Sequence, residues 1–179
     1  MLLDLSKLHG HGEHFERVFQ IAVFEPPDED YRVAAPVELS MDIDKAGKDV
    51  FRVTGRAKTT LELTCSRCVE PFELTLDARF ELRYVPQPVA PAEGEREIEI
   101  DEDDLTTAFY REGSLDVEDL LREQFQLALP MKPLCAEGCR GLCPECGVNL
   151  NRATCACKPV WEDPRLALLK GLLDRDKET

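Results

Sequence analysis

The chain has 179 residues, 43% of them hydrophobic, and its 36 acidic and 22 basic side chains give a formal net charge of −14. This length predicts one domain with room for a small appendage, and the composition excludes wholesale disorder. The charge argues against non-specific binding of nucleic acid by the whole surface, because phosphates are repelled. No run of about 20 apolar residues is present to span a bilayer. Residues 1–4 lack the pattern of a signal peptide, so we expect a soluble cytoplasmic protein.

The first predicted elements are strands. Residues 37–43 alternate apolar and polar side chains, the period of a half-buried strand, and residues 44–48 form a polar turn. Residues 50–64 are rich in Val, Thr and Leu and predict a second strand, which Gly55 could bend. Residues 72–85 alternate again, so the second and third strands form a hairpin.

An acidic segment follows the hairpin. Residues 86–94 contain three prolines and read as a flexible link. Residues 93–104 then carry eight acids and one base, with Ile98 and Ile100 spaced for a short strand. The segment is interpreted as a solvated edge or loop, and a docking surface for a basic partner is the alternative.

Two helices are predicted in the later part of the chain. Residues 116–129 carry apolar side chains at helical spacing, acids in the first turn, and Pro130 at the end. Asp163 followed by proline predicts a second helix over 164–175. We therefore expect an α+β fold, with antiparallel hairpins packed against one or two helices. The predicted division is a body over 1–130 and a cysteine-rich zinc-binding module over 131–179, docked on the body.

The cysteines carry most of the functional information. All eight belong to close pairs: Cys65-x2-Cys68, Cys135-x3-Cys139, Cys143-x2-Cys146 and Cys155-x-Cys157. In a reducing cytosol such pairs indicate metal ligands or redox groups before disulfides. Two thiolates this close on a tight turn can both reach one zinc ion, and a second pair completes the tetrahedron. We expect two zinc ions, held in closed four-thiolate sites.

The pairs are assigned to sites by their spacing. Cys143, Cys146, Cys155 and Cys157 lie in one compact loop, with Gly147 free to turn the backbone back after Cys146. The remaining four, Cys65, Cys68, Cys135 and Cys139, form the second predicted site, with the first pair at the tip of the hairpin. In an alternative partition the second and third pairs share a site, which leaves the first pair as a dithiol. Iron–sulfur ligation is also compatible with four cysteines.

Other candidate sites are weaker. His9, His11 and His14 form a sparse metal tract, for which an N-terminal loop is the favoured interpretation. Trp161 could stack on a base, but packing beside the metal loop is favoured. The sequence contains no phosphate loop, dinucleotide fingerprint, zinc-protease motif or nucleophile elbow. We therefore expect no catalytic residues and no small-molecule substrate.

Three stretches resemble a known bacterial family: CSRCVEPF at 65–72, LALPMKPLC at 127–135 and CRGLCPECGVNLN at 139–151. The ending CAC at 155–157, followed by DPRLALL, also fits. These residues resemble the YceD family, over about 60–179. The resemblance implies a role in the accumulation, processing or stability of 23S ribosomal RNA, without catalysis. It also implies that the first two cysteine pairs make the site common to the family.

The resemblance implies a large-subunit ribosomal precursor as partner, through either a basic ribosomal protein or ribosomal RNA. The acidic charge favours the protein. Contact with RNA requires five side chains to converge on one face: Arg67, Arg140, Arg152, Lys158 and Arg165. Two rival functions are a redox-switched zinc thiol chaperone and a metal-dependent hydrolase. The hydrolase needs an open coordination position and a general base, and neither is evident.

Overall fold

The computed structural model describes residues 1–7, 12–87 and 106–157. Contacts divide the chain into two units, of which the first comprises 1–65 with 70–135 and the second 66–69 with 136–179. Several sequence predictions lie outside the described residues: the strand at 98–100, the helix over 164–175, and the residues His9, His11, Lys158, Trp161 and Arg165.

Among its described residues the first unit combines β-strands with one α-helix, which confirms the predicted α+β class. Its strands are β1 (Leu2–Asp4), β2 (Glu13–Phe19), β3 (Tyr31–Val33), β4 (Val37–Gly47), β5 (Val50–Thr64), β6 (Pro71–Pro86), β7 (Thr107–Tyr110) and β8 (Ser114–Asp116). Its helices are the 3-10 turns η1 (Leu5–Lys7) and η2 (Ile21–Phe24) and the α-helix α1 (Val117–Ala128).

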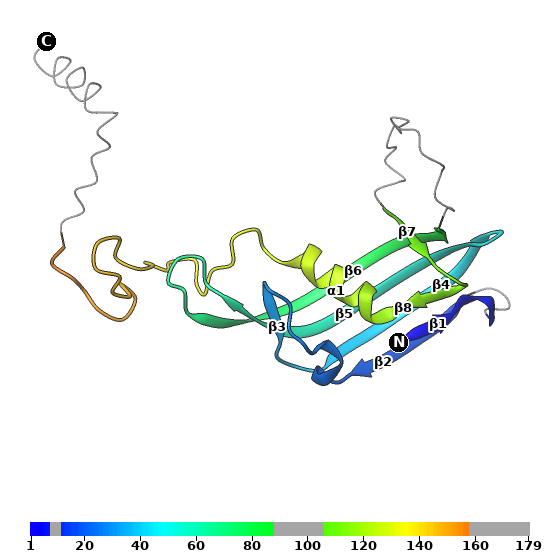
Figure 1. The fold of residues 1–179 in the computed structure, drawn as a ribbon, viewed down its shortest axis with the longest axis horizontal. Coiled ribbons are helices and arrows are strands. Elements are labelled where there is room, and N and C mark those ends of the chain that lie inside the picture. The colour runs from blue at the N-terminus through cyan, green and yellow to red at the C-terminus, as the bar shows by residue number, and fades with distance from the viewer. Residues whose placement is uncertain (8–11, 88–105, 158–179) are drawn as a thin grey trace, which may run out of the picture. The chain divides into compact units, whose positions relative to one another are not determined.

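The main sheet has six strands in the order β2-β4-β5-β6-β7, and β3 pairs with β5 (Figure 1). All its pairings are antiparallel except β6 with β7, which is parallel. The β5–β6 hairpin is the longest pairing, in register from Phe51 opposite Tyr84 to Thr64 opposite Pro71. A separate two-stranded ladder joins β1 to β8.

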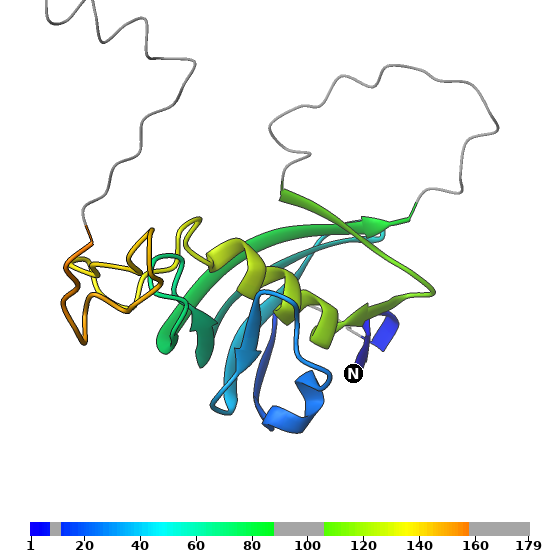
Figure 2. The same ribbon diagram turned by 60° about the vertical axis from the view of Figure 1, so that its left-hand side comes forward.

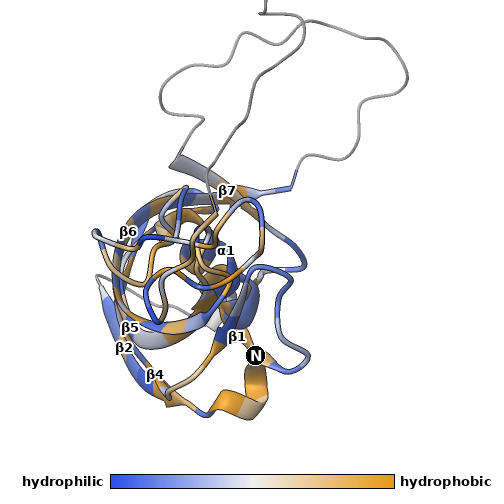
Figure 3. Ribbon diagram, turned by 90° about the vertical axis from the view of Figure 1, so that its left-hand side faces the viewer, coloured by the Kyte–Doolittle hydropathy of each residue, from blue (hydrophilic) through white to orange (hydrophobic). Residues whose placement is uncertain are grey.

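Helix α1 lies against one face of this sheet, and the strands curve around it (Figures 2 and 3). Along β4 to β6 apolar and polar side chains alternate, so each strand turns one face to the helix and the other to solvent. Asp116 caps the N-terminus of the helix, since its side chain accepts a 3.0 Å hydrogen bond from the Glu118 N–H, and the helix ends before Pro130.

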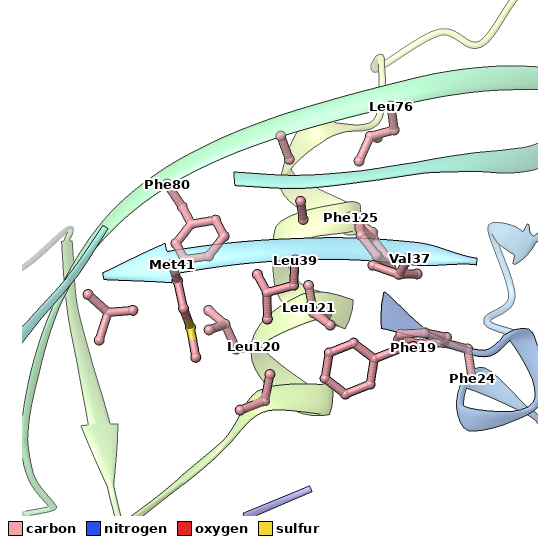
Figure 4. Close-up of a cluster of buried hydrophobic side chains, with 14 of the residues drawn as sticks. Phe19, Phe24, Val37, Leu39, Met41, Leu76, Phe80, Leu120, Leu121 and Phe125 are labelled. Atoms are coloured by element: carbon pink, nitrogen blue, oxygen red, sulfur yellow. The ribbon is translucent and has the colours of Figure 1, made fainter. Parts of the chain in front are cut away.

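The core forms between α1 and the inner face of the sheet (Figure 4). Leu121 and Phe125 of the helix are fully buried, as are Val37 and Met41 of β4. Burying a side chain of this kind contributes about 1.5–3 kcal/mol relative to leaving it in water. The helix therefore folds here as predicted, as a core element.

The first hairpin differs from its prediction. Strand β4 continues through residues 44–47, which were expected in a turn, and Asp44 and Lys45 pair with Arg52 and Phe51. The chain reverses at Lys48 and Asp49, where Asp49 adopts a left-handed φ of 60°. The predicted polar turn was too long because polar side chains also occupy the exposed end of a paired strand.

His14 also differs from its prediction. His14 lies in β2, not in a loop, and its Nδ1 is 2.8 Å from Asp42 Oδ1 on β4. The sequence of β2 does not alternate regularly between apolar and polar residues, because Arg17 occupies a position on the same side as Phe15 and Phe19. Its guanidinium lies 5.4 Å from the centre of the Phe19 ring, at the edge of the sheet.

Gly55 does not interrupt β5, because its pairing continues on both sides, to Met41 and to Phe80. A Cβ at this position would overlap the Phe80 ring and lie 2.9 Å from Met41 Cβ. The glycine therefore serves the close packing of an aromatic side chain over the strand.

Candidate metal centres

Two loops of the Cys-x-x-Cys type share one backbone geometry. In the first knuckle, residues 65–70 at the tip of the β5–β6 hairpin, the Cys65 N–H donates a 2.9 Å hydrogen bond to the Glu70 carbonyl. In the second knuckle, residues 143–148, the Cys143 N–H donates a 2.9 Å bond to the Val148 carbonyl. Both bonds span five residues, so each loop turns back after its second cysteine.

The residue after the second cysteine is left-handed in both knuckles. Gly147 has φ 72° and Val69 has φ 58°. Glycine adopts this conformation without steric cost, whereas a β-branched residue does so only under strain. The Val69 side chain is nevertheless 63% exposed, so burial does not offset the strain.

The second unit links the first cysteine loop to the later cysteine segment. The Arg67 guanidinium donates a 2.8 Å hydrogen bond from Nη1 to the Cys139 carbonyl, and the Arg67 carbonyl accepts a 3.1 Å bond from the Leu142 N–H. The Leu150 N–H bonds to the Gly141 carbonyl at 2.9 Å, which closes the second knuckle into a small hairpin. Backbone hydrogen bonds therefore hold the cysteine pairs of this unit near one another.

The cysteines gather into two groups of four. Cluster 1 consists of Cys65, Cys68, Cys135 and Cys139; cluster 2 consists of Cys143, Cys146, Cys155 and Cys157. Within each cluster the sulfur atoms all lie within 4.8 Å of one another. These are the two groups that the sequence spacing indicates, and metal ligation by them stays a prediction.

The geometry of both clusters fits a tetrahedral thiophilic ion. Four sulfurs at about 2.3 Å from a zinc ion lie about 3.8 Å apart, which is within the observed spread. The clusters differ in exposure: Cys65, Cys68 and Cys139 are at most 4% exposed, whereas Cys146 and Cys157 lie at the surface. Solvent and oxidants therefore reach cluster 2 more readily.

Electrostatics within cluster 2 also fit a cation. The backbone N–H groups of Cys146 and Glu145 point at the Cys143 sulfur and lower the pKa of this thiol to about 7. Hydrogen bonds with neighbouring thiols, foremost Cys146, raise the pKa of Cys157 to about 12. Ionisation of Cys143 is thus favoured and ionisation of Cys157 is disfavoured, because negative charges this close repel each other. A divalent cation removes that repulsion, so that all four sulfurs can ionise.

Asn151 is a site residue that the sequence reasoning did not single out. Its Nδ2 donates a 3.3 Å hydrogen bond to Cys139 Sγ in cluster 1, although it lies between the two cysteine pairs of cluster 2. Its Oδ1 accepts a 2.8 Å bond from the Arg140 N–H. N–H donors to ligating sulfurs orient the sulfur and offset its charge.

The described part of the second unit, 66–69 and 136–157, has almost no apolar interior. The residues buried there are three cysteines and one glycine: Cys68, Cys139, Cys143 and Gly141. A segment with so little hydrophobic surface to bury needs another source of stability. Metal ligation by the thiolates is the source that its residues offer.

The basic residues predicted to contact RNA are only partly described. Arg67, Arg140 and Arg152 are exposed, but the Arg67 guanidinium also binds backbone carbonyls of Glu137 and Cys139. Lys158 and Arg165 lie outside the described residues. A common basic face built from these five side chains stays a prediction.

Comparison with known proteins places this arrangement in a family. The family model described as Large ribosomal RNA subunit accumulation protein YceD matches residues 53–173, a range that contains both knuckles and all eight cysteines. The chain belongs to the YceD family. This confirms the resemblance drawn from the three cysteine-containing stretches.

Individual relatives are distant in sequence. Two are named large ribosomal RNA subunit accumulation protein YCED homolog 1, chloroplastic: the Zea mays protein is 28% identical over 69% of this chain, and the Arabidopsis thaliana protein 26% over 82%. This chain spans about half the length of each, 49% and 51%. The Bacillus subtilis protein YlbN is 24% identical, over 99% of this chain and 98% of its own length.

Two further comparisons gave negative results. No solved structure matches this YceD chain. Among the described residues, α1 and the short 3-10 turns are the helices, and none is long and apolar enough to cross a membrane.

Proposed function

We propose that this protein is a zinc-binding factor in ribosome biogenesis that supports the synthesis, processing or stability of large-subunit (23S) ribosomal RNA. The supporting observation is the family match across both four-cysteine clusters. Two plant relatives are named as large ribosomal RNA subunit accumulation proteins. On this proposal the protein acts without catalysis, in the cytoplasm, on a large-subunit precursor through a ribosomal protein or ribosomal RNA.

Zinc has a structural role in this proposal. Cluster 1 and cluster 2 each bind one ion through four thiolates, which leaves no coordination position open for a substrate. Bound zinc neutralises part of the thiolate charge and fixes the loops that carry the cysteines. The Asn151 amide supports cluster 1 from outside the ligand set, and the N–H groups of Cys146 and Glu145 support cluster 2.

The test replaces the chromosomal gene with cluster variants. We expect Cys65→Ser/Cys139→Ser and Cys143→Ser/Cys157→Ser to lower the ratio of 23S to 16S ribosomal RNA and to accumulate large-subunit precursors in sucrose gradients. Ala136→Ser/Ala156→Ser is the matched control, because it adds two hydroxyls at exposed positions beside the clusters without removing a thiol. A normal 23S level in cells whose protein is stable but zinc-free would contradict the proposal.

A second candidate function rests on the surface thiols. Cys135, Cys146 and Cys157 are exposed, so an oxidant can reach both clusters. A redox-switched chaperone would release zinc in mild peroxide and then suppress aggregation of an unfolded client protein. Zinc release without such holdase activity would exclude this function.

A further inference from the structure

The outer face of β5 and β6 is rich in arginine, although the chain as a whole is acidic. Alternation along these strands buries Phe51, Val53 and Ala57 against the core and turns the residues between them to solvent. Five cations share this outward side and are named here the basic face: Arg52, Arg56, Lys58, Arg79 and Arg83. All five belong to the first unit.

Two pairs of arginines face each other directly. Arg52 lies opposite Arg83, and Arg56 lies opposite Arg79. Like charges directly opposite on neighbouring strands destabilise a sheet, and threonine would serve the exposed face better. The two arginine rows are four residues apart, which is about 13 Å along the strands. The arrangement is costly for folding, so it needs another explanation.

Nearby carboxylates neutralise only part of this charge. Asp77 binds Arg56 through two hydrogen bonds, and Glu81 Oε1 lies 3.7 Å from Arg52 Nε. The Arg56 side chain lowers the pKa of Asp77, and the charges of Lys58 and Arg79 add to this effect. Glu62 and Glu73 also face outward but lie opposite each other further along the hairpin. The excess of positive charge is therefore confined to the part of the pairing from Arg52 to Lys58 on β5 and from Asp77 to Arg83 on β6, where five cations face two carboxylates.

The charge changes sign across the sheet. The next strand, β4, turns three acids to the same side: Glu38, Asp42 and Asp44. In register, β4 carries Glu38 opposite Lys58 and Asp44 opposite Arg52. Arg79 and Arg83 lie one strand further away, on β6, and are exposed. Asp77 and Glu81 lie next to them on the same side of β6, but these carboxylates contact Arg56 and Arg52 on β5.

An exposed aromatic side chain lies beside these arginines. In the parallel pairing of β6 with β7, Thr107 is opposite Arg83 and Phe109 is opposite Val85. Phe109 therefore points to the same side as Arg83, and it is 56% exposed. Arg52, Glu81 and Arg83 also line an open hollow of about 750 Å³. Cations beside an exposed ring on a sheet surface suit a single-stranded nucleic acid.

We propose that the basic face binds single-stranded RNA, with phosphates on its arginines and a base stacked on Phe109. The choice of RNA over another polyanion rests on the proposed function in ribosome biogenesis. Single-stranded RNA is favoured over a duplex because a base must be unpaired to stack on a side chain. The site shares no residue with either cysteine cluster.

The test measures binding of a fluorescein-labelled 20-nucleotide oligouridine to the full-length zinc-loaded protein by fluorescence anisotropy. Binding is followed between 50 and 200 mM KCl. We expect Arg79→Glu/Arg83→Glu to weaken binding at least tenfold and to reduce the slope of log affinity against log salt by about two. Lys45→Glu/Lys132→Glu makes the same change in net charge at exposed positions, and Lys45 lies opposite the inward-facing Phe51, away from the basic face. This control pair should change the affinity less than threefold.

A second variant tests the stacking contact. Phe109→Ala should weaken binding about fivefold or more while leaving the salt slope unchanged, because the ring contributes no charge. Circular dichroism confirms that each variant is folded.

Three outcomes would overturn the proposal: no binding by the wild type at 50 mM KCl, equal weakening by the control pair, or displacement of RNA by polyglutamate of the same length. The last would assign the face to an acidic protein. None of these readouts depends on ribosomal RNA levels in cells, so this proposal and the proposed function fail separately.

Discussion

Val69 combines a β-branched side chain with a left-handed backbone, φ 58°, in the position that Gly147 occupies in the second knuckle. The strain costs about 1–2 kcal/mol, which a glycine at this position would avoid. Part of that stabilisation is lost again, because glycine has greater conformational freedom in the unfolded chain. We expect Val69→Gly to raise the free energy of unfolding by about 0.5–1 kcal/mol, measured by urea denaturation of the zinc-loaded protein.

Gly147→Ala is the reciprocal control. A Cβ at Gly147 meets nothing within 4 Å, so only the backbone conformation is disturbed. We expect this change to lower stability by about 1 kcal/mol. A loss of stability in Val69→Gly would show that contacts of the Val69 side chain stabilise the fold by more than the backbone strain costs.

Asn151 offers a second test at a single residue. Because its amide donates to Cys139 Sγ, Asn151→Ala should weaken zinc binding by cluster 1 about 10–100-fold, measured by competition with a chromophoric chelator. Asn151→Asp keeps the oxygen that accepts from the Arg140 N–H but places a carboxylate beside the thiolates, so it should weaken binding at least as much. Unchanged zinc affinity in both variants would remove Asn151 from the site.

The sequence predicted some residues of the site and not others. The spacing of the cysteine pairs indicated both groups of four, because each pair needs a partner to complete a tetrahedron. The role of Asn151 was not predictable, since its contact with Cys139 depends on how an intervening hairpin folds. One signal was available for Val69: it follows Cys68 as Gly147 follows Cys146.

At the scale of elements, α1 is the main partner of the inner sheet face. Phe125 is fully buried and contacts the rings of Phe24 and Tyr31 at centroid distances of 5.7 and 6.1 Å. We expect Phe125→Ala to cost about 3–5 kcal/mol in thermal or urea unfolding. Leu127→Ala, in the same helix but at a position that is 78% exposed, should change stability by less than about 0.5 kcal/mol. Similar losses in both variants would contradict the described orientation of the helix.

Elements with long regular patterns were predicted well. Strand β5 has the predicted bounds, and β6 differs by one residue at each end, because their alternation persists over a long pairing. The short strands were missed: β3 has three residues, and β7 joins β6 only after a long intervening segment. Pairings of this kind depend on tertiary contacts that a local pattern does not contain.

At the scale of the whole molecule, the two units are stabilised by different means. The first has an extensive apolar core, whereas the buried residues in the described part of the second are cysteines and a glycine. A strong zinc chelator should therefore abolish amide hydrogen-exchange protection in peptides from 139–150 while peptides from β4 and β5 keep theirs, as followed by mass spectrometry. Persistent protection of 139–150 in zinc-free protein would show that metal is not what holds this segment.

The metal content of the purified protein shows whether the eight cysteines bind two zinc ions. The protein is purified without chelator or added metal, then analysed for elements, with titration of reactive thiols on the same sample. We predict about two zinc ions per chain and no rapidly titrating thiol, because each cluster commits four sulfurs to one ion. One zinc with about four reactive thiols, or iron in place of zinc, would contradict the assignment of one zinc ion to each cluster.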